Sequence, residues 1–157
     1  PIESNYQKYM RKNLKKQKSS AVDSHRFVNH KIETIKKNTD IIKLVPPGTR
    51  ISPNNPYISG IKRRNIMLLD RNKPSPTLTS IPDDIIHYNE PRVLTVREYA
   101  RIQSFPDWNH FKGKYKSGGK KKKKEVPRYT QIANAVPPLF AEQVGLAIKE
   151  ALIKYGK

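Results

Sequence analysis

Arg92–Asp107 reads RVLTVREYARIQSFPD and decides how the second half of the chain folds. Thr95 and Glu98 have the spacing of a capping box, in which each side chain accepts a hydrogen bond from the other residue's backbone amide. This exchange satisfies two of the amides that a helix N-terminus leaves without partners. Leu94 and Tyr99 stand at the two positions of a hydrophobic staple. The pattern therefore predicts a helix that starts directly after Thr95.

Proline sets the predicted end of this helix. Pro106 disfavours a helical conformation at the preceding residue, Phe105. We therefore expect one helix over residues 96–104, followed by the turn Phe105–Asp107. A capping box alone is common and indicates only a helix, so the function has to be read from the whole string and its neighbours.

Two other segments of the sequence, taken together with this stretch, resemble motif blocks of one protein family. Arg92–Asp107 closely resembles the block R-x-L-T-V-R-E-x-A-R-x-Q-x-F-P-D of cytosine-5 DNA methyltransferases. Downstream, Pro127–Pro138 (PRYTQIANAVPP) is similar to that family's last block, Y-x-Q-I-G-N-A-V-P-P. Upstream, Leu69-Asp70 and Lys73–Thr79 look like the strand and turn that lead into the first block. Three matches in the correct order make the resemblance specific.

The resemblance implies a cofactor. In that family the end of the chain returns to a Rossmann-like catalytic domain that binds S-adenosyl-L-methionine. Carried over, Asn134, Ala135 and Val136 should face this cofactor, with the Asn134 amide as the main polar contact. Ala133 stands where the family usually has glycine, and its methyl group could crowd the turn or restrict its dihedral angles.

The chain has no cysteine. Members of the resembled family attack carbon 6 of cytosine with a cysteine thiolate, so this chain cannot supply the nucleophile. It also lacks the family's glycine-rich F-x-G-x-G, Pro-Cys, Glu-Asn-Val and Gln-x-Arg-x-Arg segments. We expect a C-terminal portion or small subunit that has no catalytic residue and is inactive alone. The missing catalytic part would complete an enzyme of a restriction-modification system that flips a cytosine out of duplex DNA and methylates its carbon 5.

Composition points to nucleic acid independently of any motif. The 157 residues include 32 Lys and Arg against 13 Asp and Glu, a formal charge of +19, with 35% hydrophobic residues and a mean hydropathy of −0.80. Such an excess calls for a polyanion, and nucleic acid is the usual one. A ribosomal or membrane-surface protein is the alternative. No apolar run approaches the roughly 18 residues of a membrane span, and no signal peptide appears. We therefore expect no membrane partner and a cytoplasmic, nucleoid-associated location.

Residues 1–91 are expected to form a basic arm and a target-recognition region. In the arm, Tyr6, Met10 and Leu14 recur every four residues and predict a helix over about residues 5–17. Its lysines either contact phosphates or form a solvated face.

A second helix is expected within residues 25–43, with Ile32, Ile35 and possibly Lys36 on one side. His25 and His30 lie in the same stretch, but no cysteine or paired carboxylate joins them. Polar or capping roles are therefore expected, and no metal site.

The segment between residues 46 and 60 is too rich in Pro and Asn for a helix or a central strand, so a loop is predicted. Lys62, Arg63, Arg64 and Asn65 follow it, ahead of the strand-like Ile66–Leu69. Arginine and asparagine make bidentate contacts to guanine and adenine, although such a run can also contact phosphates alone. Either way we predict that this turn touches DNA.

Thr77-Leu78 is a third candidate for DNA contact. In the resembled family, a Thr-Leu or Thr-Val pair here packs beside the backbone of the flipped nucleotide, with the threonine hydroxyl on a phosphate. The alternative is a β-branched residue in a short strand, which needs no ligand. The resemblance favours DNA contact.

Residues 113–125 read GKYKSGGKKKKKE, a composition that predicts a flexible, solvent-facing loop. Lys120–Lys124 could lie along a duplex and add salt-dependent, sequence-independent affinity. A solubilising loop is the alternative.

The last helix is predicted to begin near Pro137 or Pro138, where proline is tolerated. Its apolar stripe consists of Phe140, Val144, Ala147, Ile148, Ala151 or Leu152, and Tyr155. A stripe of this kind must bury against something. Because no other part of the chain offers a large apolar face, we expect it to pack on the missing domain.

The expected fold class is α+β: a small, loop-rich target-recognition region with short β-strands, then helices that pack on a separate Rossmann-like, S-adenosylmethionine-dependent domain. Residues 92–157 form the second unit, with the Lys-rich loop. Two alternatives stay open, a stand-alone non-catalytic DNA-binding protein derived from such an enzyme and a structural RNA-binding protein.

Overall fold

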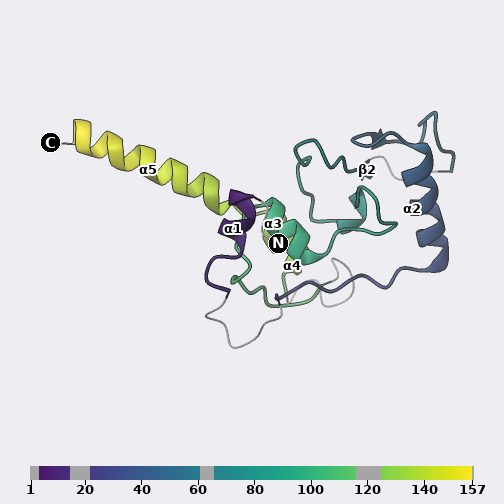
Figure 1. Cartoon of the computed structure of the whole chain (residues 1–157), viewed down its shortest axis with the longest axis horizontal. Helices are drawn as coiled ribbons and strands as arrows, with labels where there is room; N and C mark the ends of the chain where they lie inside the picture. Colours follow the sequence, from purple (N-terminus) through teal and green to yellow (C-terminus); the bar gives the residue numbers. More distant parts are fainter. Residues whose placement is uncertain (1–3, 15–21, 61–65, 116–124, 157) are drawn as a thin grey trace.

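The computed structural model describes residues 4–14, 22–60, 66–115 and 125–156 (Figure 1). In these residues it is an α+β structure with one small sheet, as predicted. The elements run in the order α1 (Asn5–Met10), α2 (Ile32–Leu44), β1 (Arg50–Ile51), β2 (Ile66–Leu68), the 3-10 helix η2 (Pro82–Asp84), β3 (Ile85–Ile86), α3 (Val96–Ile102), α4 (Arg128–Ala133) and α5 (Pro138–Tyr155).

The sheet has the strand order β1-β2-β3. β1 pairs antiparallel with β2, and β2 pairs parallel with β3, where Met67 faces Ile85. Ile66 and Leu68 are buried while Met67 between them is half-buried, which is the period of two expected of a strand with one covered face. β2 therefore confirms the strand predicted from residue 66. The Pro-rich stretch before it is mostly irregular and contributes only the two-residue edge strand β1.

Two hydrophobic clusters hold these elements. The first joins α3 and α4 to the segment before η2, and consists of Leu78, Ile85, Leu94, Val96, Tyr99, Ala100, Phe111, Tyr129 and Ile132. The second lies between α2 and the sheet, and consists of Ile41, Val45, Ile51, Ile66, Leu68 and Ile86. β3 contributes Ile85 to the first cluster and Ile86 to the second, because successive residues of a strand point to opposite faces.

The buried face of α2 differs from the predicted one. Ile32 is 81% exposed and Ile35 is 41% exposed, whereas Asn38 and Ile41 are buried. With Val45, which follows the helix, Asn38 and Ile41 have the spacing of three and four that forms one helix face. The second cluster covers only this C-terminal half of α2, so the isoleucines of the first turn lie beyond it.

α1 is shorter than the helix predicted over residues 5–17. Ser4 caps its start by accepting a hydrogen bond from Gln7, and the helix ends at the buried Met10. Asn13 adopts a left-handed conformation with φ 67°, which asparagine tolerates better than most residues and which a helix cannot continue through. The remainder of the predicted helix, from residue 15, lies outside the described residues.

α5 projects away from the rest of the molecule (Figure 1). None of its eighteen residues is buried. Among the described residues, no helix is both long enough and apolar enough to cross a membrane.

Candidate functional site: the junction of the two motif blocks

The two motif blocks pack directly on each other through α3 and α4. The rings of Tyr99 and Tyr129 meet edge to face, with 5.0 Å between centroids and an interplanar angle of 88°. The Tyr129 hydroxyl donates to the Leu94 carbonyl over 2.7 Å. Burial raises the pKa of both tyrosines, so both hydroxyls stay protonated. The first cluster thus brings together two segments that the sequence separates.

The predicted capping box starts α3. The Thr95 hydroxyl accepts from the Glu98 amide over 3.2 Å, and the Thr95 amide donates to the Glu98 carboxylate over 2.7 Å. Arg92 donates to both Glu98 oxygens, at 2.8 and 2.9 Å. Burial alone would raise the pKa of Glu98, but the hydrogen bonds from Arg92 and Thr95 outweigh it and lower the pKa. Leu94 and Tyr99, the staple residues, are both buried in the first cluster.

α3 ends earlier than predicted. Its last residue is Ile102, and Ser104 is left-handed with φ 60°. The Phe105 amide donates back to the Ala100 carbonyl over 2.8 Å, the hydrogen bond of a Schellman-type C-terminus. The helix is therefore stopped by this left-handed turn, two residues before Pro106 could act.

Ser104 also connects the end of α3 to the start of α5. Pro137, the N-cap of α5, makes no side-chain capping bond, and Pro138 has no amide hydrogen to offer. The buried Ser104 hydroxyl instead accepts from the Leu139 amide over 3.1 Å. One of the amides left open at the start of α5 is thus satisfied by a residue from the other block.

The predicted cofactor residues occupy the link between α4 and α5. Asn134 is the C-cap of α4, and its backbone amide donates to the Thr130 carbonyl over 3.1 Å. The Asn134 side chain is exposed, Ala135 is half-buried and Val136 is 62% exposed. The side-chain amide of Asn134 and the apolar side chain of Val136 are thus both accessible to a ligand. A hydrogen-bonding group beside an apolar group is chemically compatible with one wall of a cofactor pocket. Ala133 has ordinary helical backbone and packs against the first cluster, so glycine is not required here.

Arg97 is a functional candidate that sequence reasoning missed. Its side chain is fully buried in the middle of this junction. It donates to the backbone carbonyls of Asp23 at 2.8 Å, Pro106 at 3.1 Å and Asn109 at 2.6 Å. Burial lowers the pKa of Arg97, although the negative charges of Asp107 and Asp23 act in the opposite direction and would raise it. One of these partners lies 74 residues away in the sequence, so no local pattern could reveal the contact.

Thr77 and Leu78 have different environments. Thr77 is exposed, whereas the Leu78 side chain is buried in the first cluster. Neither residue belongs to a strand. The following residue, Thr79, donates to the Asp84 carboxylate over 2.9 Å and so ties this segment to η2. Thr77 is therefore accessible from solvent, while Leu78 anchors the segment in the first cluster.

The other predicted DNA-contacting residues cannot be placed. Lys62, Arg63, Arg64 and Asn65 lie outside the described residues. Lys120–Lys124 also lie outside them. Both predictions of DNA contact therefore remain predictions.

Neither histidine that the sequence singled out belongs to a metal-ligand group. His25 Nδ1 lies 3.3 Å from the Thr95 hydroxyl, and His30 Nε2 accepts from the Val93 amide over 3.3 Å. Within the described residues, no group of three or more His, Asp or Glu side chains could hold a metal ion.

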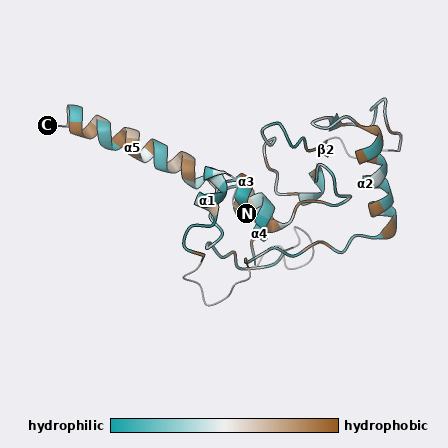
Figure 2. Ribbon diagram, in the orientation of Figure 1, coloured by the Kyte–Doolittle hydropathy of each residue, from teal (hydrophilic) through white to brown (hydrophobic). Residues whose placement is uncertain are grey.

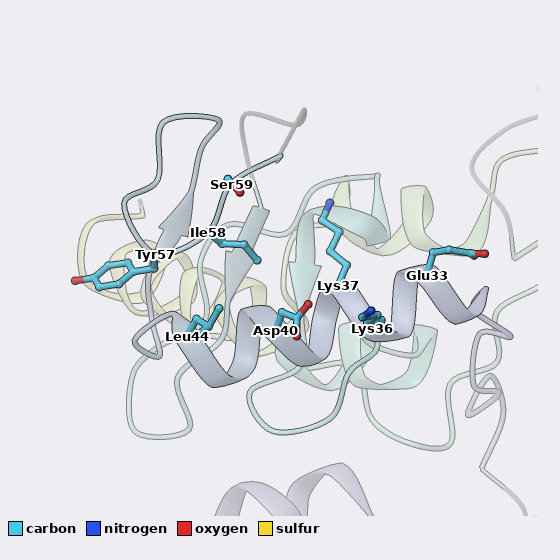
Figure 3. Close-up of a pocket in the computed structure, with 8 residues that line it drawn as sticks. All are labelled: Glu33, Lys36, Lys37, Asp40, Leu44, Tyr57, Ile58 and Ser59. Atoms are coloured by element: carbon cyan, nitrogen blue, oxygen red, sulfur yellow. The ribbon is translucent and has the colours of Figure 1, made fainter.

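A surface pocket of about 470 Å³ lies elsewhere, between α2 and the loop that precedes residue 61 (Figure 3). Its lining carries both signs of charge and some apolar surface, and consists of Glu33, Lys36, Lys37, Asp40, Leu44, Tyr57, Ile58 and Ser59. None of Asn134, Ala135, Val136, Thr77 and Leu78 lines it, so we place the candidate site at the junction of the motif blocks.

Every member of the predicted stripe of α5 is exposed. Figure 2 shows that hydrophobic residues recur along the whole of this helix. Phe140 is 62% exposed, Ile148 55% and Leu152 64%. Leu146 and Ile153, on a different face from the stripe, are 47% and 75% exposed. A helix with two apolar faces is typical of one buried between other elements.

Comparison with known proteins shows which family the chain belongs to. The model of the C-5 cytosine-specific DNA methylase family matches residues 2–150. The chain belongs to this family. A type II methyltransferase, M.AquIB of Picosynechococcus sp., is 38% identical over 138 residues, which cover 87% of this chain and 94% of that protein.

Longer family members match in the same way over part of their length. M1.HphI of Haemophilus parahaemolyticus is 34% identical and M.Eco47II of Escherichia coli is 35% identical, covering 87% and 78% of this chain. The chain spans only 32% and 30% of these two type II methyltransferases. Relatives of this chain therefore include both a protein of similar length and proteins about three times longer.

Proposed function

We propose that this chain is the C-terminal portion or small subunit of a DNA (cytosine-5)-methyltransferase of a restriction-modification system. It would supply target recognition and one wall of the S-adenosyl-L-methionine pocket, while a separate catalytic part supplies the nucleophile. The observation that carries this proposal is the junction of the two motif blocks. There the exposed Asn134–Val136 link leads into α5, whose apolar faces have no partner within the described residues.

Two further observations support a separate catalytic part that supplies the nucleophile. The chain contains no cysteine, the residue that the family's chemistry requires. It also matches about a third of the length of longer relatives, which leaves two thirds for the remaining functions.

In the assembled enzyme, Asn134 would hydrogen-bond the cofactor and Val136 would pack against it. The cofactor supplies the methyl group. Thr77 would contact a phosphate near the flipped cytosine, and Lys62, Arg63, Arg64 and Asn65 would contact the duplex. The net charge of +19 favours this association through attraction to the phosphate backbone.

The direct test is a methyl-transfer assay with labelled S-adenosyl-L-methionine and mixed-sequence duplex DNA. The chain is assayed alone and then with a polypeptide that carries the front part of a relative. We expect activity only in the mixture. Activity of the chain alone would refute the cysteine argument, and inactivity of both samples with tight DNA binding would favour a stand-alone DNA-binding protein.

Asn134→Ala tests the cofactor assignment in the same assembly. We expect the affinity for S-adenosyl-L-methionine to fall by about tenfold, the effect of one lost hydrogen bond of about 1.4 kcal/mol. DNA affinity should stay within about twofold. Asn89→Ala removes an exposed side-chain amide outside the two motif blocks and is the matched control. Equal losses in the two titrations would refute the assignment.

A further inference from the structure

Asp23 joins three segments that are far apart in the sequence. Its backbone carbonyl accepts from Arg97 Nε over 2.8 Å. Its carboxylate accepts from the Phe111 amide over 2.9 Å and lies 3.5 Å from Arg128 Nη1. These partners follow it by 74, 88 and 105 residues. A residue from the N-terminal part of the chain thus contacts both motif blocks and the segment between them.

Ser24 completes this connection through a strained turn. It is left-handed, with φ 65°, although it is not glycine, and it is only 4% exposed. Its hydroxyl donates to the Asp23 carboxylate over 2.7 Å and accepts from Arg128 over 2.8 Å, while its carbonyl accepts from the Arg97 amide over 3.1 Å. Such a conformation persists only where its surroundings over-determine it.

Arg128 is the residue through which Asp23 reaches α4. It is the first residue of this helix, where the positive end of the helix dipole disfavours a cation. The Asp23 carboxylate offsets that charge, and Arg128 also donates to the Gly113 carbonyl and the Tyr115 hydroxyl over 2.8 and 3.0 Å. α4 has only six residues, so Arg128 lies less than about two helical turns from Asn134.

The Asp23 side chain is ionised at neutral pH, because its pKa is lowered in the folded chain. Burial would raise the pKa of this carboxyl, but the Phe111 amide, the Ser24 hydroxyl and the guanidinium groups of Arg128 and Arg97 outweigh burial and lower it.

We propose that Asp23 is a positioning residue for cofactor binding, which acts through Arg128 to hold α4 in the orientation that presents Asn134–Val136. It does not itself touch the cofactor. The inference rests on the proposed function, because the ligand of Asn134–Val136 comes from there, but the Asp23–Arg128 link is a property of this chain alone.

The kinetic test uses the assembled methyltransferase and Asp23→Asn, which keeps the size of the side chain and removes its charge. We expect the KM for S-adenosyl-L-methionine to rise by about tenfold while kcat and the KM for DNA stay within about twofold. Glu90→Gln removes a carboxylate that binds Arg92 at 2.6 Å and is the matched control, with no change expected in either KM. Equal rises of both KM values in Asp23→Asn would overturn the proposal.

A second readout needs neither cofactor nor catalysis. Amide hydrogen exchange is measured on the chain itself at Asn134 and Ala135, whose amides close the end of α4. In Asp23→Asn we expect exchange there to be about fivefold faster or more, with the Leu68 amide in the sheet unchanged. Asp23→Glu, which retains the carboxylate, should show smaller changes in the same direction and replaces the asparagine variant if that one does not fold.

The two readouts separate the two proposals. Faster exchange at the end of α4, in a chain whose assembly transfers no methyl group, would support the role of Asp23 and refute the proposed function. The role of Asp23 would be refuted if the assembly transfers methyl groups but Asp23→Asn leaves amide exchange unchanged and does not raise the KM for S-adenosyl-L-methionine above that for DNA. The proposed function would then still be supported.

Discussion

α3 and α5 belong to the two motif blocks, yet they differ in almost every physical respect. α3 has seven residues, four of which are buried: Val96, Arg97, Tyr99 and Ala100. α5 has eighteen residues and none is buried. The short helix is held by a capping box, by the first hydrophobic cluster and by the hydrogen bonds of Arg97. The long helix contacts the described residues through Ser104 at its first turn.

The difference shows that α3 is held by contacts within this chain, whereas no described element covers the apolar faces of α5. Isolated helices shorter than about 12–15 residues are marginal in water, so α3 depends on its tertiary contacts. α5 is long enough to be helical without such contacts, but its two apolar faces then remain in water.

The largest expected effect is that of Arg97→Ala in α3. The change removes a buried cation and the hydrogen bonds that it donates to three carbonyls; of these, the Pro106 carbonyl keeps the amide of Asn109 as a donor. We expect the free energy of unfolding to fall by about 3–5 kcal/mol, measured by urea denaturation. Arg101→Ala, a partly exposed arginine paired with Asp107, is the control and should cost clearly less. Equal costs would show that burial of Arg97 is not what fixes α3.

Alanine at Phe140, Val144 and Ile148 tests α5. These side chains are 62%, 42% and 55% exposed, so the free energy of unfolding of the chain alone should change by less than about 0.5 kcal/mol. The affinity for the catalytic part, measured by calorimetry, should fall by at least about 100-fold, because the buried apolar area is lost from the interface. Alanine at Gln143 and Glu150, which are exposed and lie between the two apolar faces, should leave the affinity nearly unchanged. A loss of intrinsic stability with normal assembly would reverse the contrast between the two helices.

Thr95→Ala removes one half of the capping box of α3. The Glu98 amide then loses its acceptor in a buried position, and we expect a cost of about 1 kcal/mol in thermal or urea unfolding. Ser4→Ala removes the corresponding cap of α1, where the hydrogen bond is exposed to solvent, and should cost only a few tenths of a kcal/mol. If the two substitutions cost the same, the buried environment of α3 adds nothing to its cap.

The smallest effect concerns acid. The pKa values of Glu98 and Asp23 are lower in the folded chain than their ordinary values. Their contribution to stability is therefore complete above the unfolded pKa, near pH 4, and is lost as the pH falls through the lower folded pKa. Glu98→Gln should flatten the dependence of the unfolding midpoint on pH below about pH 4.5, and the α5 alanine variant should leave it unchanged. An unchanged slope in Glu98→Gln would show that this carboxylate contributes nothing to acid sensitivity.

The sequence determined the features that depend on neighbours along the chain. The capping box at Thr95, the strand at Ile66–Leu68 and the start of α5 at Pro138 each follow from local chemistry, and each is present. The three segments also predict the family from the sequence, and the family model that matches residues 2–150 confirms it.

The tertiary structure alone decided which faces are buried and which distant residues meet. Ile32 and Ile35 gave α2 the more obvious apolar face, yet the sheet covers Asn38 and Ile41 because it lies against the other end of the helix. The left-handed turn at Ser104 ended α3 and capped α5 at once. Asp23 reached Arg128 across 105 residues. Periodicity and capping act over a few residues and are written in the sequence, whereas such contacts exist only after the chain has folded, since they depend on where packing brings each segment.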